Sequence, residues 1–239
     1  MKRYLIILAV CFLAGAGWTW AKNAPKDAKT FVLENIIWHG QSAIEVRNGM
    51  NIFCDPYKLK NTGKADLILI THPHPDHLSP EDIKKIQTSD TVIVAPDDPL
   101  CKKKLTGEVI YMKPGETINV KGVVIEAVRA YNTGITSYFH KKASKWLGYI
   151  FTVDGIRIYT AGDTDLIPEM KEIYADIAFL PVGGLVTMSP AEASTAALEI
   201  KPKIAIPMHY GIIPGSSGNG EKFRNWLANK MEVIVMQAQ

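Results

Sequence analysis

Apolar and polar positions follow the same order twice along the chain. In each copy a Trp-x-Gly begins an apolar stretch, a polar turn follows, and a second apolar stretch ends at Asp, over residues 38–55 and 146–163. The turns contain Asn48-Gly49 and Asp154-Gly155, pairs that suit the positive φ angles of a tight hairpin. The pattern therefore predicts two similar β-hairpins.

Each predicted hairpin is followed by a strand, a helix and a second strand. The predicted strands cover residues 65–70, 91–96, 175–180 and 203–207. Ser79-Pro80 and Ser189-Pro190 mark the helix starts, because Ser is a favourable N-cap and Pro a favourable first helical residue. Strands joined by helical crossovers predict an α/β fold with helices outside the sheets. Two such halves would pack as an αβ/βα four-layer sandwich, and one doubly wound sheet is the alternative.

The first residues of the chain have a different pattern. Lys2 and Arg3 precede an almost purely apolar run, and residues 19–21 offer a small-x-small cleavage site. The run is short for a membrane-spanning helix, which needs about 20 residues. We therefore predict a signal peptide over residues 1–21 and export to the periplasm or the extracellular space. An uncleaved membrane anchor is the alternative, and a lipoprotein signal at Cys11 is less favoured because that residue lies too early.

The rest of the chain, residues 22–239, is predicted to form one domain with an extended lead over residues 22–30. Hydrophobic residues make up 47% and charged residues 21% of the sequence, as in ordinary globular proteins. Removing the signal peptide lowers the formal charge from +3 to +1, which argues against a nucleic-acid partner. Cys54 and Cys101 could pair in an oxidising compartment, but nothing in their spacing requires a disulfide.

A histidine-rich motif directly follows the first predicted strand after the first hairpin. Residues 71–77 read T-H-P-H-P-D-H, an H-x-H-x-D-H pattern. On an extended segment His72 and His74 project to the same side and can bind one ion. Asp76 and His77 lie where the chain bends toward the helix and can reach a second ion. Imidazole and carboxylate ligands suit zinc, and also manganese or iron.

This motif after a buried strand resembles the signature of the metallo-β-lactamase superfamily. The similarity extends to residues 161–164, Ala-Gly-Asp-Thr, and 207–211, Pro-Met-His-Tyr-Gly, so it covers nearly all of the mature chain. The sequence is most similar to the metal-dependent hydrolases that include sugar-lactone lactonases and are related to N-acyl-phosphatidylethanolamine phospholipases. The resemblance implies the αβ/βα sandwich, with two divalent metal ions between its sheets.

The resemblance also implies the ligands of the first metal ion. His72 and His74 would bind it, and Asp163 would bridge it to the second ion. A further histidine is usual in this family, but residues 130–132 read Ala-Tyr-Asn where we expect it. His140 is the remaining histidine between the motifs, and we assign it this role. A loop histidine that contacts substrate is the alternative.

For the second metal ion the resemblance implies Asp76, His77 and His209, together with the bridging Asp163. Asp163 and His209 each follow a predicted strand of the second half, where sites form in α/β sheets. His39 lies near a turn where related chains often carry a histidine. It is a candidate ligand or substrate contact, and otherwise a structural residue.

Other residues are candidates for orienting the ligands or binding substrate. Asp55 and Asp66 lie at strand ends and could accept a hydrogen bond from a ligand imidazole, although a turn or cap role is equally open. Lys141 and Lys142 lie in the loop over residues 131–146, where they could favour an anionic substrate or simply be solvated.

The implied reaction is hydrolysis of a small molecule. A metal-bridging hydroxide would attack a carbonyl carbon or phosphorus, with Asp76 positioning it, and so cleave a lactone, an ester or amide, or a phosphodiester. A metal-binding or sensor protein without turnover, and a di-iron oxidoreductase on the same fold, are the alternatives. We expect no stable membrane insertion after signal removal, and the sequence leaves the oligomeric state open.

Overall fold

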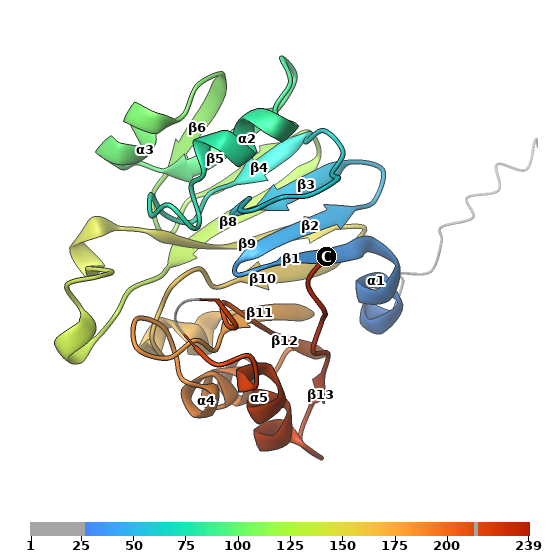
Figure 1. Cartoon of the computed structure of the whole chain (residues 1–239), viewed down its shortest axis with the longest axis vertical. Helices are drawn as coiled ribbons and strands as arrows, with labels where there is room; N and C mark the ends of the chain where they lie inside the picture. The colour runs from blue at the N-terminus through green and yellow to red at the C-terminus, as the bar shows by residue number, and fades with distance from the viewer. Residues whose placement is uncertain (1–26, 213–214) are drawn as a thin grey trace, which may run out of the picture.

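The computed structural model describes residues 27–212 and 215–239, so the predicted signal peptide lies outside the described residues. Two β-sheets pack face to face, with helices on their outer sides (Figure 1). The predicted αβ/βα sandwich is therefore confirmed. In the described part of the chain, no helix has both the length and the apolar character needed to cross a bilayer.

The first sheet contains six strands in chain order, and the second contains seven in the order β13-β12-β11-β10-β9-β8-β7. The strands of the first sheet are β1 (Ile36–Gly40), β2 (Ala43–Arg47), β3 (Asn51–Cys54), β4 (Leu67–Leu69), β5 (Val92–Pro96) and β6 (Glu108–Met112). Those of the second are β7 (Thr117–Val120), β8 (Val123–Arg129), β9 (Leu147–Val153), β10 (Ile156–Thr160), β11 (Ile177–Pro181), β12 (Ile204–Met208) and β13 (Glu232–Val233).

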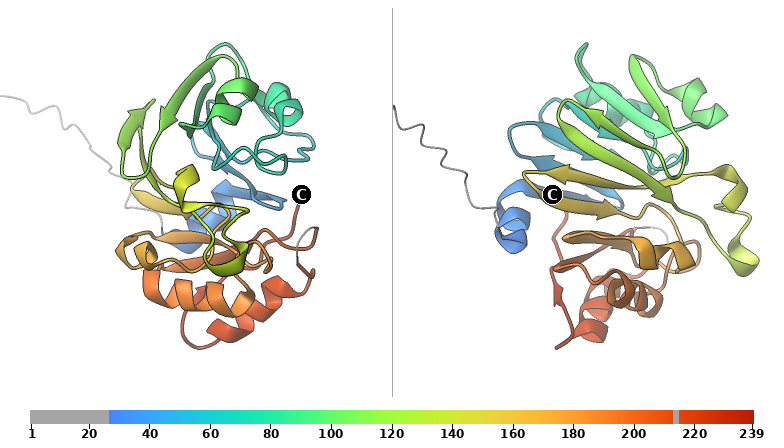
Figure 2. Two further views of the ribbon diagram at one scale, coloured as in Figure 1. Left: turned by 90° about the vertical axis from the view of Figure 1, so that its left-hand side faces the viewer. Right: turned by 180° about the vertical axis from the view of Figure 1, so that it is seen from behind.

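Helices cover the outer side of each sheet. The α-helices are α1 (Ala28–Asn35), α2 (Pro80–Ile86), α3 (Pro99–Lys104), α4 (Pro190–Ile200) and α5 (Asn219–Leu227), and the short 3₁₀ helices are η1 (Gly134–Thr136), η2 (Lys142–Ser144) and η3 (Pro168–Glu172). Helices α2 and α3 lie outside the first sheet, and α4 and α5 outside the second (Figure 2). Ser79 and Ser189 cap α2 and α4 through their side chains, as predicted.

The two halves repeat the same topology. In the first, β2 and β3 are antiparallel, and β3, β4 and β5 are parallel. In the second, β9 and β10 are antiparallel, and β10, β11 and β12 are parallel. The predicted internal repeat is thus present in three dimensions.

The two hairpin turns differ in length. Val153 pairs with Ile156, so Asp154 and Gly155 form the predicted two-residue turn, with φ of 49° and 77°. In the first hairpin a three-residue loop follows β2, and within it only Gly49 has a positive φ. The prediction of a tight turn is therefore wrong for the first hairpin, where one extra residue lengthens the loop.

The apolar side chains form two clusters. One fills the space between the sheets and extends to α4 and α5, and the other lies between the first sheet and helices α2 and α3. Cys54 belongs to the first and Cys101 to the second, and both are buried free thiols. Burial raises the pKa of Cys101 to about 12, so its thiol is inert at neutral pH.

The start of the described chain corrects one prediction. Residues 28–30 were expected to be extended, but they form the first turn of α1. The Asp27 carboxylate accepts hydrogen bonds from the backbone N–H groups of Lys29 (3.0 Å) and Thr30 (3.2 Å), a favourable N-cap. Phe31 and Val32 then bury themselves in the central core. Capping and burial together favour the helix.

Candidate functional site

The chemistry-bearing side chains meet where parallel strands of both sheets end. The loop 71–77 follows β4, Asp163 follows β10, and His209 follows β12. Ligand sites form in this position in α/β sheets. Gly162 has a φ of 63°, and a Cβ there would lie 2.9 Å from the carbonyl oxygen of Leu147. Glycine is therefore required for the close approach that places Asp163.

Three histidines form the first group of the cluster. The ligand atoms of His72, His74 and His140 all lie within 4.8 Å of one another. His72 Nε2 is 3.1 Å from His74 Nδ1. His140 comes from the loop between η1 and η2, yet its side chain is buried. The indole of Trp146 packs against all three rings, with centroid separations of 4.9 to 5.6 Å.

Asp76, His77 and His209 form the second group, again with ligand atoms within 4.8 Å. Asp76 Oδ2 is 3.7 Å from His77 Nε2 and 3.6 Å from His209 Nε2. His209 has a left-handed φ of 56°, and its backbone N–H donates to the carbonyl oxygen of Gln41 at 2.8 Å. This bond joins the end of β12 in the second sheet to the turn after β1 in the first.

Asp163 lies between the two groups. Its Oδ2 is 3.4 Å from His140 Nε2 and 3.1 Å from His209 Nε2. Its Oδ1 is 3.3 Å from His77 Nε2. One buried carboxylate therefore faces imidazole nitrogens of both groups.

Asp55 holds His77 from outside the cluster. Its Oδ2 accepts from His77 Nδ1 at 2.8 Å and from the Thr71 hydroxyl at 2.6 Å, and its Oδ1 accepts from the Thr71 backbone N–H at 2.8 Å. Thr71 Oγ1 in turn lies 3.0 Å from His72 Nδ1. These bonds assign the Nδ1 protons, so Nε2 of His72 and Nε2 of His77 face the cluster.

His140 is oriented in the same way. Its Nδ1 donates to the side-chain oxygen of Asn132, which directs Nε2 toward Asp163. Asp66, the other candidate for such a contact, instead accepts from the backbone N–H of Asn51 at the opposite end of β4. Of the two aspartates, only Asp55 contacts a histidine of the cluster.

The charges in the cluster shift its pKa values in opposite directions. Burial raises the pKa of Asp76, but the neighbouring His209 and His77 outweigh burial and lower the pKa to about 2. Burial lowers the pKa of His209, but the Asp163 carboxylate outweighs it and raises the pKa to about 9. Carboxylates are thus charged in this cluster at neutral pH, and they attract cations.

His39 does not join the cluster. Its Nε2 lies 2.9 Å from Glu45 Oε2, and Glu45 also accepts two hydrogen bonds from Arg47. Gln41 faces the cluster instead, with Nε2 at 2.9 Å from Asp76 Oδ2 and 3.0 Å from His209 Nε2. Sequence reasoning missed Gln41, although it follows Gly40 in a turn.

Trp146 and Asn132 were also missed as parts of the site. Both lie in the loop over residues 131–146, where substrate contacts were predicted, but the sequence singles out neither as part of the site. The predicted substrate lysines lie elsewhere. Lys142 Nζ is 3.0 Å from Glu169 Oε1 and 3.1 Å from the Tyr131 hydroxyl, and Lys141 is exposed beside it. Neither has a described contact with the cluster.

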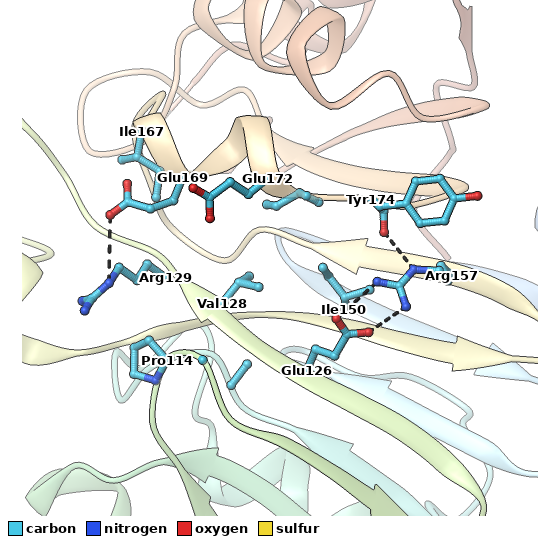
Figure 3. Close-up of a pocket in the computed structure, with 13 residues that line it drawn as sticks. Pro114, Glu126, Val128, Arg129, Ile150, Arg157, Ile167, Glu169, Glu172 and Tyr174 are labelled. Carbon is cyan, nitrogen blue, oxygen red and sulfur yellow. Dashed lines mark hydrogen bonds and ion pairs between the residues drawn. The ribbon is translucent and has the colours of Figure 1, made fainter.

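A separate hollow of about 310 Å³ lies against β8, β9 and β10, beside η3. Ion pairs close its two ends, as Figure 3 shows. Arg157 pairs with Glu126 at 2.7 Å, and Arg129 lies 3.9 Å from Glu169. No residue of the cluster lines this hollow, and its cations already face carboxylates.

Among the described residues, four buried polar atoms of the cluster have no hydrogen-bond partner. They are His77 Nε2, His140 Nε2, His209 Nδ1 and Asp163 Oδ1. A buried polar atom without a partner is unfavourable, and a bound cation would give such nitrogen and carboxylate atoms a partner. Nitrogen and carboxylate donors gathered in this way suit divalent metal ions. The cluster is therefore compatible with metal binding.

Comparison with known proteins agrees with this chemistry. Residues 35–209 match the family described as the β-lactamase superfamily domain. A metal-dependent hydrolase of Thermococcus onnurineus is 33% identical over 219 residues, covering 83% of this chain and 94% of the relative. A metal-dependent hydrolase of Thermoplasma acidophilum is 36% identical over 203 residues, covering 79% of this chain and 88% of the relative. The crystal structure of a proposed metal-dependent hydrolase from Parabacteroides distasonis has a TM-score of 0.76 and 36% identity, covering 85% of this chain and 93% of that one. This chain thus belongs to the β-lactamase superfamily and is a metal-dependent hydrolase, as the sequence motifs predicted.

Proposed function

We propose that the chain binds two divalent metal ions, with zinc the first candidate and manganese or iron the others. His72, His74 and His140 would hold one ion, and Asp76, His77 and His209 the other. Asp163 would serve both. The observation that carries this proposal is the set of buried, unpartnered atoms His77 Nε2, His140 Nε2 and Asp163 Oδ1, which point into one cluster.

When bound, such ions supply a nucleophilic hydroxide at neutral pH and polarise the bond under attack. The chain's own residues prepare the site for this chemistry. Asp55 and Asn132 hold the imidazoles of His77 and His140 in the orientation that turns Nε2 toward the cluster. Trp146 covers the three histidines of the first group and excludes water from that side.

Asp76 is the residue placed to handle a proton. Its carboxylate is half-buried, in contrast to the buried Asp163, and the Gln41 amide donates to its Oδ2 at 2.9 Å. Its pKa of about 2 keeps it ionised at neutral pH, so it can accept a hydrogen bond from an attacking water. We assign Asp76 the positioning of water and the transfer of its proton toward the leaving group.

The reaction we propose is hydrolysis of a lactone, an ester or amide, or a phosphodiester in a small molecule. The test combines metal analysis of the natively metallated protein with a panel of these three substrate classes. We expect about two metal ions per chain, and metal-dependent turnover of at least one class that a chelator abolishes and added metal restores. His74→Ala and Asp163→Ala should lose metal and turnover together. Full metal content and unchanged turnover in both variants would overturn the site.

We also propose that the chain is exported after removal of residues 1–21. The apolar run after Lys2 and Arg3 and the small residues before Lys22 support this proposal. The N-terminal sequence of protein recovered from its native host tests it. A periplasmic or extracellular protein that begins at Lys22 is expected, and a cytoplasmic protein that begins at Met1 would contradict it.

A further inference from the structure

A cavity of about 390 Å³ lies beside the cluster of histidine and aspartate side chains. Four segments distant in sequence line it: the end of β1, the loop after β3, residues 210–212 and 217 after β12, and the last described residues, Ala238 and Gln239. The last segment is held in place because the backbone N–H of Gln239 donates to the carbonyl oxygen of Trp38 at 3.0 Å. The volume of the cavity suits a small molecule or part of one.

The cavity and the cluster share a wall. Gln41 lines the cavity, and its side-chain amide lies 2.9 Å from Asp76 and 3.0 Å from His209. Tyr210 and Gly211, which directly follow His209, line the same cavity. A molecule held there therefore lies next to the residues that would carry out the reaction.

The lining has an unbalanced positive charge. Lys58 and Lys60 line it, and no Asp or Glu is among the described residues that do. Lys58 Nζ lies 5.1 Å from the ring centroid of Tyr57, and within residues 27–212 and 215–239 neither lysine forms an ion pair. By contrast, Lys142 faces Glu169. The ammonium groups at the cavity are thus available to an anion.

The backbone that carries these lysines is anchored. The buried Asp82 carboxylate accepts hydrogen bonds from the backbone N–H groups of Lys58 (2.9 Å) and Leu59 (3.0 Å). Lys58 has a left-handed φ of 51°, a conformation that costs energy for a residue other than glycine. Trp38 and Tyr210, which also line the cavity, support each other by stacking with ring centroids 5.2 Å apart. A binding site gains affinity when its groups are held in place before the ligand arrives.

We propose that this cavity binds the part of the substrate remote from the bond that is cleaved, and that Lys58 and Lys60 select a negatively charged group there. The inference rests on the proposed hydrolytic function, whose substrate it narrows. It replaces Lys141 and Lys142, the lysines suggested by the sequence, with two that line a cavity beside the cluster.

Two esters of matched length test the proposal. 4-Nitrophenyl pentanoate is neutral, and mono-4-nitrophenyl glutarate carries a carboxylate where the pentanoate has its terminal methyl group. We expect the wild-type enzyme to have the higher kcat/KM for the glutarate ester. The double variant Lys58→Gln/Lys60→Gln should lower the ratio of the two kcat/KM values about tenfold, mainly through KM for the glutarate ester. Lys58→Arg/Lys60→Arg should retain most of the preference.

The double variant Lys141→Gln/Lys145→Gln is the matched control, because it removes the same charge from the protein surface outside the cavity. A wild-type enzyme without preference for the glutarate ester would overturn the proposal. So would a ratio within twofold of wild type in Lys58→Gln/Lys60→Gln, or a loss of preference confined to the Lys141 and Lys145 variant.

A binding measurement separates this proposal from the hydrolytic one. Trp38 lines the cavity and Trp146 packs against the histidines of the cluster, so a nitrophenyl group bound between the two places should quench tryptophan fluorescence. We expect the metal-free chain to bind mono-4-nitrophenyl glutarate more tightly than Lys58→Gln/Lys60→Gln does. If the metal-loaded enzyme hydrolyses neither this ester nor any class in the panel, the proposed function fails. Absent or identical quenching in wild type and variant overturns the anion site itself.

Discussion

Replacing Asp55 with Asn tests the hydrogen bonds that hold His77 from outside the cluster. The two side chains have nearly the same size, but Asn offers one acceptor oxygen where Asp55 uses two. If the Asn oxygen accepts from the Thr71 backbone N–H, the amide NH₂ faces His77 Nδ1. His77 can then accept only in the tautomer with its proton on Nε2, and this proton occupies the atom that faces Asp163. In the reverse orientation the NH₂ faces the backbone N–H of Thr71.

Either orientation leaves one buried polar group mismatched, which costs about 1–3 kcal/mol. Loss of an outer hydrogen bond to a metal-binding histidine typically weakens metal binding by about 10–100-fold. This range corresponds to about 1.4–2.8 kcal/mol, so the two estimates agree. We therefore expect Asp55→Asn to raise the Kd of the full chain for zinc by about 10–100-fold.

The assay is competition with a chromophoric chelator at neutral pH, on protein whose circular dichroism matches wild type. Asp66→Asn is the control, because Asp66 bonds to the backbone of Asn51 at the end of β4 remote from the cluster. Its Kd should stay within about twofold of wild type. Wild-type affinity in Asp55→Asn, or an equal loss in Asp66→Asn, would refute the role assigned to Asp55.

Three further predictions follow from the same cluster. The pKa of His209 is about 9 in the folded chain and about 6.5 when unfolded, so its contribution to the stability of the metal-free chain is complete below about pH 6.5 and lost by about pH 9. Urea unfolding should show a decrease of up to about 3 kcal/mol over this window, and constant or rising stability would contradict it. His39→Leu should leave zinc affinity within about twofold but destabilise the fold by about 1–3 kcal/mol, because the buried Glu45 loses a hydrogen-bond donor. A large change in zinc Kd would return His39 to the ligand set. Gly162→Ala should lower the melting temperature and zinc affinity together, since its Cβ would lie 2.9 Å from the Leu147 carbonyl oxygen, and an unaffected variant would show that the loop can shift.

The sequence predicted most of the fold because its local signals agree with one another. Buried strands β4, β5, β11 and β12 consist of apolar residues, and a Ser-Pro cap begins the helix that follows β4 and β11. The helix α1 was not predicted, because it depends on one Asp N-cap and on two side chains whose burial shows only in the folded chain. The extra loop residue of the first hairpin carries no sequence signal that distinguishes it from the second.

Some residues of the candidate site could be predicted from the sequence, and others could not. His72, His74, Asp76 and His77 lie together in sequence, so their proximity could be predicted from the motif. Gln41 could not, because its approach to the cluster depends on a backbone hydrogen bond from His209, 168 positions away. Such contacts are decided when the two sheets pack against each other.

Two aspartates approach the imidazole of His77 from opposite sides. Asp55 directly follows β3, and Asp163 lies three residues after the end of β10. Asp55 accepts from Nδ1 at 2.8 Å, and Asp163 Oδ1 lies 3.3 Å from Nε2. With its proton directed to Asp55, the neutral ring presents a lone pair to a second carboxylate, an arrangement that is repulsive unless a cation lies between them. In the metal-free chain a proton can fill this role, and despite the opposing effect of burial the two carboxylates raise the pKa of His77 well above its usual value. The two halves of the fold therefore create, by their packing, a position that requires either a proton or a metal ion.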